Sequence, residues 1–191
     1  MNASTPPEQP PEQPPELTLE LAGPAATAAV GEALGRLLRA GDVLALEGEL
    51  GAGKTSLVRG LAAGVGVDPA AVSSPTFVRL VEHEPAGGGG GEPGGGPWLV
   101  HVDAWRVRGA GELEDLGWGP ELLAGSVVAV EWASRVREAL PADRLEASIA
   151  HTPGGGRSLR IGGVGRRAAR VLAAADALRA AAAAPTVGPD A

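Results

Sequence analysis

One eight-residue stretch constrains the fold of this chain more than any other. Residues 48–55 read GELGAGKT, which fits the pattern G-x-x-x-x-G-K-[ST]. The stretch follows an apolar run at 43–47 (VLALE) and leads into a helical pattern at 54–63. In this strand–loop–helix context, backbone N–H groups cradle phosphate oxygens at the N-terminus of the helix. The pattern therefore predicts a P-loop that binds a nucleotide.

Lys54 makes this motif specific. The chain contains 30 Gly, so the glycine spacing alone carries little information, but Lys54 is its single lysine. It occupies the motif position where a compact ammonium is needed and an arginine would not serve. We expect Lys54 to reach the β- and γ-phosphates and the hydroxyl of Thr55 to bind Mg²⁺. The glycines 48, 51 and 53 would let the backbone wrap closely around the phosphates.

Two carboxylates follow apolar strands further along the chain. Asp103 ends WLVHVD, and Glu131 ends VVAVE. Ligands of parallel α/β sheets bind at the carboxyl ends of the strands, so both side chains are expected to face the phosphates. One would hold the magnesium and the other would orient the attacking water. Trp132 directly follows Glu131, and His101, which lies within its strand, is expected to be structural.

Residues 73–77 (SSPTF) precede a further strand and have two possible interpretations. They could form a nucleotide-sensing loop in which the Thr76 hydroxyl approaches the γ-phosphate or the metal. The alternative is an ordinary helix-to-strand turn with local hydroxyl capping.

Strands alternate with helices along the chain, which predicts an α/β fold. We predict a P-loop NTPase fold with a mostly parallel sheet, flanking helices and antiparallel edge strands. Besides the P-loop unit, the expected strands are 17–21, 77–81, 98–102 and 127–131, the helices are 24–40, 111–124 (one or two) and 132–139, and 144–150 with 158–161 form a hairpin.

Composition sets the predicted boundaries. Residues 1–16 are rich in Pro and Glu and are expected to be a disordered tail, residues 17–164 to be the ATPase domain, and residues 85–97 (PAGGGGGEPGGGP) to be a disordered insertion. Residues 165–191 are expected to be an Ala-rich helical or disordered tail. The net charge of −7 and the lack of a basic stripe argue against nucleic-acid binding by the chain alone. No stretch resembles a signal peptide or a membrane span, so we expect a cytoplasmic protein with no membrane contact.

Several short motifs occur in one order and together resemble the TsaE (YjeE) family, the small ATPases of bacterial tRNA threonylcarbamoyladenosine synthesis. The resemblance spans about residues 17–162. The matching segments are TAAVG at 27–31, GDVLALEGELGAGKT at 41–55, SPTF at 74–77, HVDAWR at 101–106, ELEDLG at 112–117 and VEW at 130–132. The family often has Tyr where Trp105 stands, which keeps an aromatic ring.

The resemblance implies a role for each matching position. The phosphates of ATP would be bound by Gly51, Ala52, Gly53, Lys54, Thr55 and Ser56, with Thr27 near the nucleotide. Thr55 and Glu131 would coordinate Mg²⁺, and Glu131 would also contact the nucleotide complex. Thr76, Asp103, Glu131 and Trp132 would serve hydrolysis. The implied partners are the TsaB and TsaD proteins, whose turnover in modifying adenosine 37 of tRNA the ATPase would support.

Two other functions fit the P-loop. A P-loop small-molecule kinase would need an acceptor pocket and an Arg-rich lid, and the ordered region shows no such lid. A nucleotide-dependent adaptor would bind ATP without useful hydrolysis.

Overall fold

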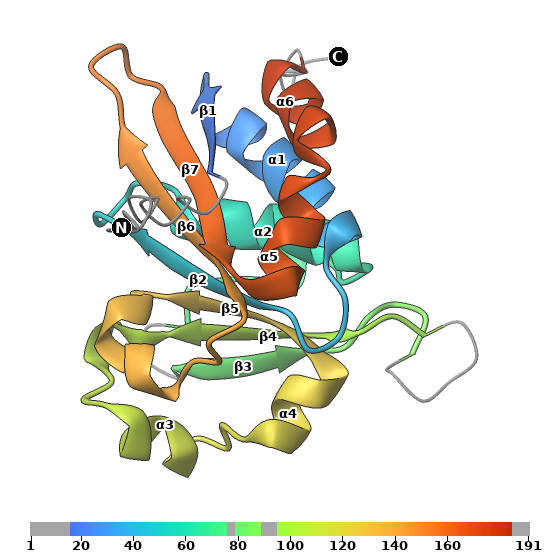
Figure 1. Cartoon of the computed structure of the whole chain (residues 1–191), viewed down its shortest axis with the longest axis vertical. Helices are drawn as coiled ribbons and strands as arrows, with labels where there is room; N and C mark the ends of the chain where they lie inside the picture. The colour runs from blue at the N-terminus through green and yellow to red at the C-terminus, as the bar shows by residue number, and fades with distance from the viewer. Residues whose placement is uncertain (1–15, 76–78, 89–94, 185–191) are drawn as a thin grey trace, which may run out of the picture.

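The computed structural model describes residues 16–75, 79–88 and 95–184. These residues form an α/β fold around a seven-stranded sheet in the order β1-β7-β6-β2-β5-β4-β3 (Figure 1). The neighbours β6, β2, β5 and β4 are parallel, whereas β7, β1 and β3 pair antiparallel. The predicted fold class is therefore confirmed. The strands are β1 (Leu17–Leu21), β2 (Val43–Gly48), β3 (Leu80–His83), β4 (Trp98–Asp103), β5 (Ser126–Glu131), β6 (Arg144–His151) and β7 (Arg157–Val164).

The strands β2, β4 and β5 are mostly apolar because helices cover both faces of the sheet. Every residue of β5 is buried, as are the first four of β2. The parallel register aligns the strands at their carboxyl ends, where Asp103 of β4 is the register partner of Glu131 of β5. The chain leaves β2 at Gly48 on the same edge. The strand register thus brings the P-loop and both carboxylates together.

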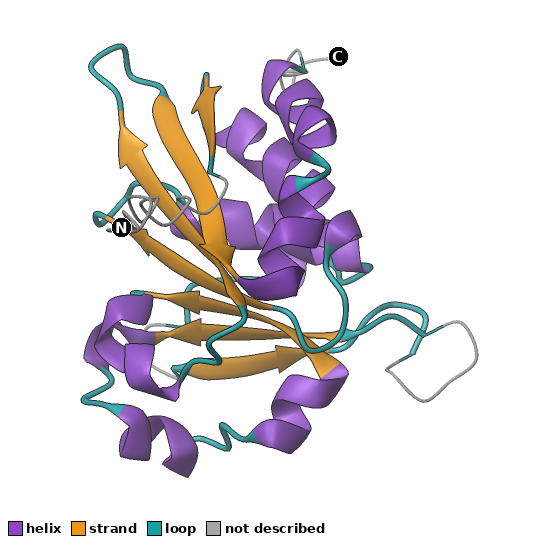
Figure 2. Ribbon diagram, in the orientation of Figure 1, coloured by secondary structure: helices purple, strands orange, loops and turns teal. Residues whose placement is uncertain are grey.

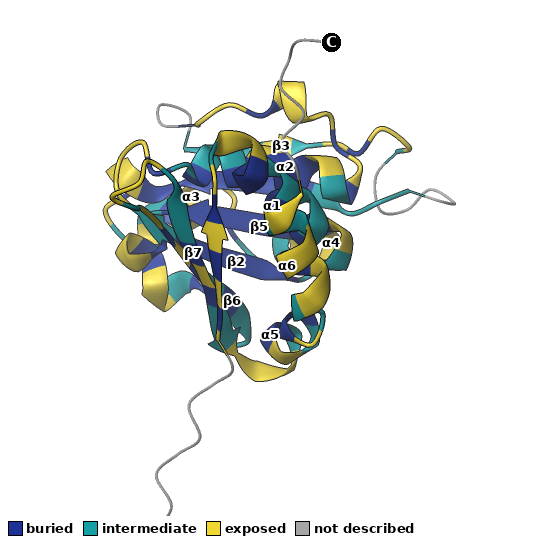
Figure 3. Cartoon of the chain, turned by 90° about the horizontal axis from the view of Figure 1, so that it is seen from above, coloured by how far each residue is buried: buried dark blue, intermediate teal, exposed yellow. Residues whose placement is uncertain are grey.

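Helices form two layers around this sheet (Figure 2). One apolar cluster joins one face to α1, α2, α5 and α6, and a second joins the other face to α3, α4 and the 3₁₀ segments η2 and η3. A view from above shows the central strands buried between the layers (Figure 3). The helical segments are α1 (Pro24–Leu37), α2 (Lys54–Val65), η1 (Pro69–Ala71), η2 (Ala104–Arg106), α3 (Ala110–Asp115), α4 (Pro120–Gly125), η3 (Ala133–Ala139), α5 (Gly165–Leu172) and α6 (Ala175–Ala183).

The P-loop helix α2 packs unusually closely against α1. A Cβ added at Gly60 would lie only 2.0 Å from the carbonyl oxygen of Ala28, so this position requires glycine. Thr27 lies next to Ala28 in α1, is fully buried, and donates its hydroxyl to the carbonyl of Gly23 at 3.0 Å. The close approach at Gly60 packs α2 against α1 as well as against the sheet.

The Ala-rich segment predicted after residue 164 is helical over α5 and α6, and these helices pack onto the domain. Helices α5 and α6 bury Ala168, Val171 and Leu178 in the main apolar cluster. Asp42, just before β2, is 1% exposed and forms ion pairs with two arginines of α5, Arg167 at 3.1 Å and Arg170. An alanine-rich segment can pack as well as fray, and here a few apolar residues and one buried carboxylate anchor it. None of the described helices has the length and apolar character needed to cross a membrane.

Two predicted elements differ locally. The strand predicted at 77–81 begins only at Leu80, because Arg79 has a φ of 74° that breaks the extended backbone; residues 77 and 78 lie outside the described part. The helix predicted at 132–139 is a 3₁₀ segment, η3, kinked at Val136. Most of the 85–97 insertion, residues 89–94, also lies outside the described part.

Candidate functional site

A cavity of about 400 Å³ opens at the carboxyl edge of the central strands. Its walls come from the P-loop, the first turn of α2, the segment before β3 and the ends of β4 and β5. The lining residues are Leu50, Gly51, Gly53, Lys54, Thr55, Ser56, Ser74, Asp103, Trp105, Glu131 and Trp132.

The P-loop connects β2 to α2 with a left-handed residue at the helix start. Gly53 caps α2 with a φ of 113°, a conformation that favours glycine. Arg157 of β7 donates its Nε–H to the carbonyl of Ala52 in the loop at 2.9 Å. A residue of the β6–β7 hairpin thus fixes the carbonyl of Ala52. The first N–H groups of α2 have no intrahelical acceptors and carry the positive end of the helix dipole, which suits an anion.

Lys54 is the cation of the cavity. Its Nζ donates to the carbonyls of Gly48 at 2.7 Å and Glu49 at 2.9 Å, and lies 3.9 Å from the centroid of a Trp132 ring. Burial lowers the pKa of Lys54 below its ordinary value, and the nearby charges of Glu131, Asp103 and Glu47 oppose that shift. The ammonium is thus largely removed from water. A charged phosphate oxygen would accept a stronger hydrogen bond from it than the two neutral carbonyls do.

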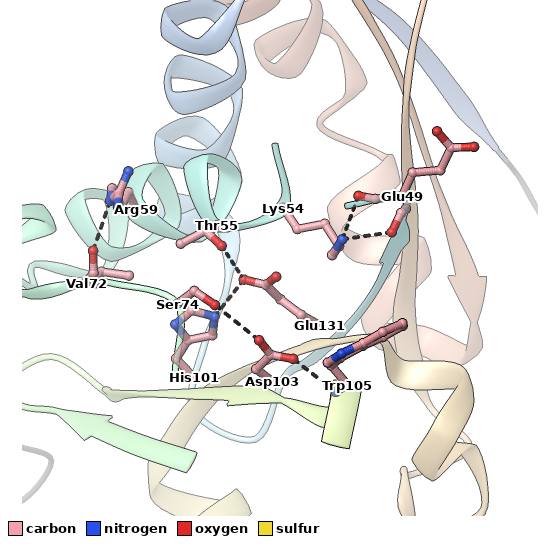
Figure 4. A network of polar contacts seen from close by, with 11 residues as sticks. Glu49, Lys54, Thr55, Arg59, Val72, Ser74, His101, Asp103, Trp105 and Glu131 are labelled. Atoms are coloured by element: carbon pink, nitrogen blue, oxygen red, sulfur yellow. Dashed lines mark hydrogen bonds and ion pairs between the residues drawn. The ribbon is translucent and has the colours of Figure 1, made fainter. Parts of the chain in front are cut away.

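Glu131 lies between α2 and β4. Its Oε1 accepts the hydroxyl of Thr55 at 2.9 Å and is 2.9 Å from the Nε2 of His101 (Figure 4). The Glu131 side chain is 4% exposed and that of His101 is fully buried. Because both neighbours belong to packed elements, the carboxylate has a defined orientation at the floor of the cavity.

Asp103 lies beside Glu131 with different partners. Its Oδ2 accepts the hydroxyl of Ser74 at 3.1 Å, and its Oδ1 accepts the backbone N–H of Trp105 at 3.0 Å (Figure 4). Ser74 belongs to the segment between η1 and β3, and Trp105 lies in the short 3₁₀ turn η2. Asp103 thus connects the strand end to the segment that holds Ser74 and to η2.

Two tryptophans form one wall. The Trp105 and Trp132 rings lie 4.6 Å apart between centroids with an interplanar angle of 49°, and Arg135 covers the Trp105 ring at 4.9 Å. Trp132 has a φ of 58°, an uncommon conformation for a bulky residue, which turns the chain sharply away from β5. Trp105 is 45% exposed, so this wall reaches from the buried lysine to the surface.

The family model "Threonylcarbamoyl adenosine biosynthesis protein TsaE" matches residues 21–159. The chain belongs to the TsaE family. A protein from Streptomyces coelicolor, named tRNA threonylcarbamoyladenosine biosynthesis protein TsaE, is 44% identical over 72% of this chain and 90% of its own length. A Bacillus subtilis protein of the same name is 36% identical over 74% of this chain and 82% of its own. The crystal structure of Bacillus subtilis YdiB superposes with a TM-score of 0.66 at 26% identity, covering 86% of this chain and 97% of that one.

In this member of the TsaE family, most predicted site residues meet at the cavity. Gly51, Gly53, Lys54, Thr55, Ser56, Asp103, Glu131 and Trp132 all line it. Ala52 is buried in the loop with its carbonyl turned to Arg157. Thr27 is buried in α1 and does not line the cavity, and Thr76 lies outside the described residues. The sequence pattern singled out the 73–77 segment through Thr76 rather than Ser74, gave no indication of Arg157, and predicted a structural role for His101.

The TsaE-family cavity has ligands that suit magnesium. The Thr55 hydroxyl and the Glu131 carboxylate meet beside the P-loop. In the part of the chain that the structure describes, no group of three or more His, Cys, Asp or Glu could hold a metal by itself. Magnesium is usually bound by one or two protein oxygens together with water and substrate phosphates. This sparse oxygen set therefore fits a metal that arrives with a nucleotide.

Proposed function

We propose that this chain binds ATP with Mg²⁺ and hydrolyses it as the ATPase of tRNA threonylcarbamoyladenosine biosynthesis. In this role it would support turnover of a complex of TsaB and TsaD proteins that modifies adenosine 37 of tRNA. Membership of the TsaE family supports the pathway. The observation that carries the ATPase assignment is the meeting of Lys54, Thr55 and Glu131 at the start of α2, inside one cavity.

Phosphate binding would rest on the loop and Lys54. The ammonium of Lys54 exchanges its two carbonyl acceptors for phosphate oxygens, which are charged and accept stronger hydrogen bonds. The N–H groups of residues 51–56 supply the remaining donors. Because the ammonium is already buried, little further desolvation opposes the exchange.

Thr55 and Glu131 would hold Mg²⁺ through their oxygens. When bound, the metal supplies positive charge that neutralises the phosphate oxygens. Glu131 is suited to this task because its carboxylate is fixed by partners on α2 and β4.

Asp103 would orient the attacking water. It lies at the end of β4, beside Glu131 in the register, and it lines the same cavity. Its links to Ser74 and Trp105 place it where a turn could change its position during the reaction cycle. Trp132 would keep water away from the Lys54 side of the phosphates, and Thr76 remains a proposed hydrolysis residue that follows Ser74 and Pro75 in sequence.

The partners would supply the tRNA contacts. The chain carries a net charge of −7, which opposes binding to a polyanion. We expect the protein alone to show no appreciable tRNA affinity at physiological salt.

The test is ATP turnover by the purified protein, alone and with the host TsaB and TsaD proteins, together with co-purification of the three proteins with and without ATP. We expect hydrolysis that depends on magnesium and on the complex. Phosphate transfer to an added acceptor would favour the kinase alternative instead. Tight ATP binding without single-turnover hydrolysis, even with partners, would favour the adaptor.

A further inference from the structure

His101 is a site residue to which the proposed reaction gives no role. It is fully buried on β4, and its Nδ1 has no hydrogen-bond partner among the described residues. A buried polar atom without a partner costs free energy that an apolar side chain would avoid. Packing alone therefore gives no reason for a histidine at this position, and its one polar contact, to Glu131, has to be examined.

That contact fixes one particular oxygen. An ionised carboxylate only accepts hydrogen bonds, so the Nε2 of His101 donates to Oε1 of Glu131 at 2.9 Å. The same oxygen accepts from Thr55 at 2.9 Å. Donors from two elements, α2 and β4, thus converge on Oε1 (Figure 4), and in the described ranges Oε2 makes no hydrogen bond while Glu131 lines the cavity.

The two donors differ in what else they do. Thr55 is itself a candidate metal ligand, so its hydrogen bond to Glu131 would change when the Thr55 oxygen binds the metal. His101 lies behind the carboxylate on β4, does not line the cavity, and has no such second task. Its hold on Oε1 would persist through every state of the site.

We infer that His101 is a positioning residue, which holds the Glu131 carboxylate so that Oε2 is presented to the metal–nucleotide complex. The inference rests on the proposed function. Hydrogen-bonded partners behind a metal ligand commonly matter by about 10–100-fold in metal affinity or activity. His101 is a residue of this kind: it contacts the metal-binding carboxylate of Glu131 but would touch neither the metal nor the nucleotide.

The test uses three variants. His101→Leu removes the donor and fills the space with an apolar side chain, while His101→Gln keeps an N–H donor. His83→Leu is the matched control, because His83 lies on the adjacent strand β3 and also has a buried, unpartnered ring nitrogen, but has no hydrogen bond to Glu131 in the described part. If His101→Leu does not fold, His101→Met supplies a more adaptable apolar side chain.

The measurement is the affinity for a non-hydrolysable ATP analogue, by calorimetry, in EDTA and across a magnesium series. We expect His101→Leu to raise the magnesium concentration for half-maximal effect by about tenfold or more. Affinity in EDTA should stay unchanged, His101→Gln should restore most of the loss, and His83→Leu should resemble the wild type.

A double-mutant cycle separates positioning from a general structural role. If His101 acts through Glu131, His101→Leu has no further effect on the magnesium requirement in a Glu131→Gln background. An unchanged magnesium requirement in His101→Leu, or an equal loss of affinity with and without metal, would overturn the inference. A wild-type protein that shows no magnesium-dependent affinity would instead refute the proposed function itself.

Discussion

The ends of β4 and β5 lie side by side, and each presents a carboxylate to the same cavity, but the two are held differently. Glu131 at the end of β5 is bonded by side chains of α2 and β4, which belong to the packed core. Asp103 at the end of β4 is bonded by a hydroxyl of the segment before β3 and by the backbone of a 3₁₀ turn. Neighbours in the register thus differ in the kind of element that supplies their hydrogen-bond donors.

This difference suggests a division of labour. A group held by packed elements keeps its geometry and suits a ligand that is present throughout the cycle, such as the metal. A group held by turns can change its position when those turns rearrange, which suits a step that must be gated. Four changes test the comparison, ordered by the loss of nucleotide affinity expected from each.

Lys54→Ala should cause the largest loss, because Lys54 is the cation next to both strand ends. Removing one partner of a buried charge pair costs about 2–5 kcal/mol, which corresponds to a loss of roughly 30-fold or more in affinity. Calorimetry with ATP measures it. Arg59→Ala is the matched control, since Arg59 is a cation on the same helix that contacts Val72 and does not line the cavity. Wild-type affinity in Lys54→Ala would refute the phosphate site.

Glu131→Gln should reduce the magnesium-dependent part of ATP affinity and slow hydrolysis together, by roughly tenfold or more, because a charged ligand is lost. Affinity in EDTA should not fall, since a negative charge near the phosphates has been removed. Glu47→Gln is the control, because Glu47 also acts on Lys54 by its charge but does not line the cavity. A magnesium defect of equal size in both variants would show that net charge, not ligation, is responsible.

Asp103→Asn should leave ATP affinity nearly intact and slow turnover by about 100-fold, the scale of a positioned acid–base group. Ser74→Ala, which removes one hydrogen bond to Asp103, should show a smaller effect of the same kind. Magnesium titrations of affinity and single-turnover rates distinguish the two acids. If Asp103→Asn carries the magnesium defect and Glu131→Gln does not, the roles of the two strand ends are reversed.

Local pattern was sufficient to predict the frame of the site. The apolar runs ending in Asp103 and Glu131 and the strand–loop–helix around Lys54 are contiguous signals, and parallel register then brings them to one edge. Contacts across the sheet carry no such signal. Arg157 reaches the P-loop carbonyl from β7, 105 residues away, and nothing in the sequence around either position indicates it.

The same limit explains the remaining differences. His101 looks like a core residue within an apolar strand, and only the neighbouring strand reveals that its ring faces Glu131. The alanine-rich end of the chain has a helical pattern that does not indicate where it packs, and its ion pairs are made with Asp42, far away in the sequence. Trp132 has a left-handed backbone, so the expected helix begins one residue later, at Ala133, and as a 3₁₀ segment.

The smallest loss of nucleotide affinity is expected from deleting residues 86–96. This deletion tests whether the Asp103 end of β4 depends on the opposite end of the strand, at Trp98. The segment connects β3 to β4 at the end of β4 that lies farthest from Asp103. Besides the turn bond from the Gly88 N–H to the carbonyl of Pro85 at 3.0 Å, the described contacts that the deletion removes are few: the Ala86 N–H donates to the carbonyl of Gly66 at 2.9 Å, and Gly96 lies close to Val65. Both are at the C-terminal end of α2, away from its P-loop end.

The deletion would leave four residues, Glu84, Pro85, Pro97 and Trp98, between the register partners His83 and Leu99. Four-residue connections are common in hairpins, and each halving of loop length lowers the entropic cost of closure by about 0.6 kcal/mol. We therefore expect unfolding free energy to be unchanged or slightly higher, with ATP affinity and turnover close to wild type. Thermal unfolding and calorimetry measure both. A folded variant that has lost turnover but kept affinity would show that the far end of β4 controls Asp103, and that the contrast between the two strand ends extends along the whole strand.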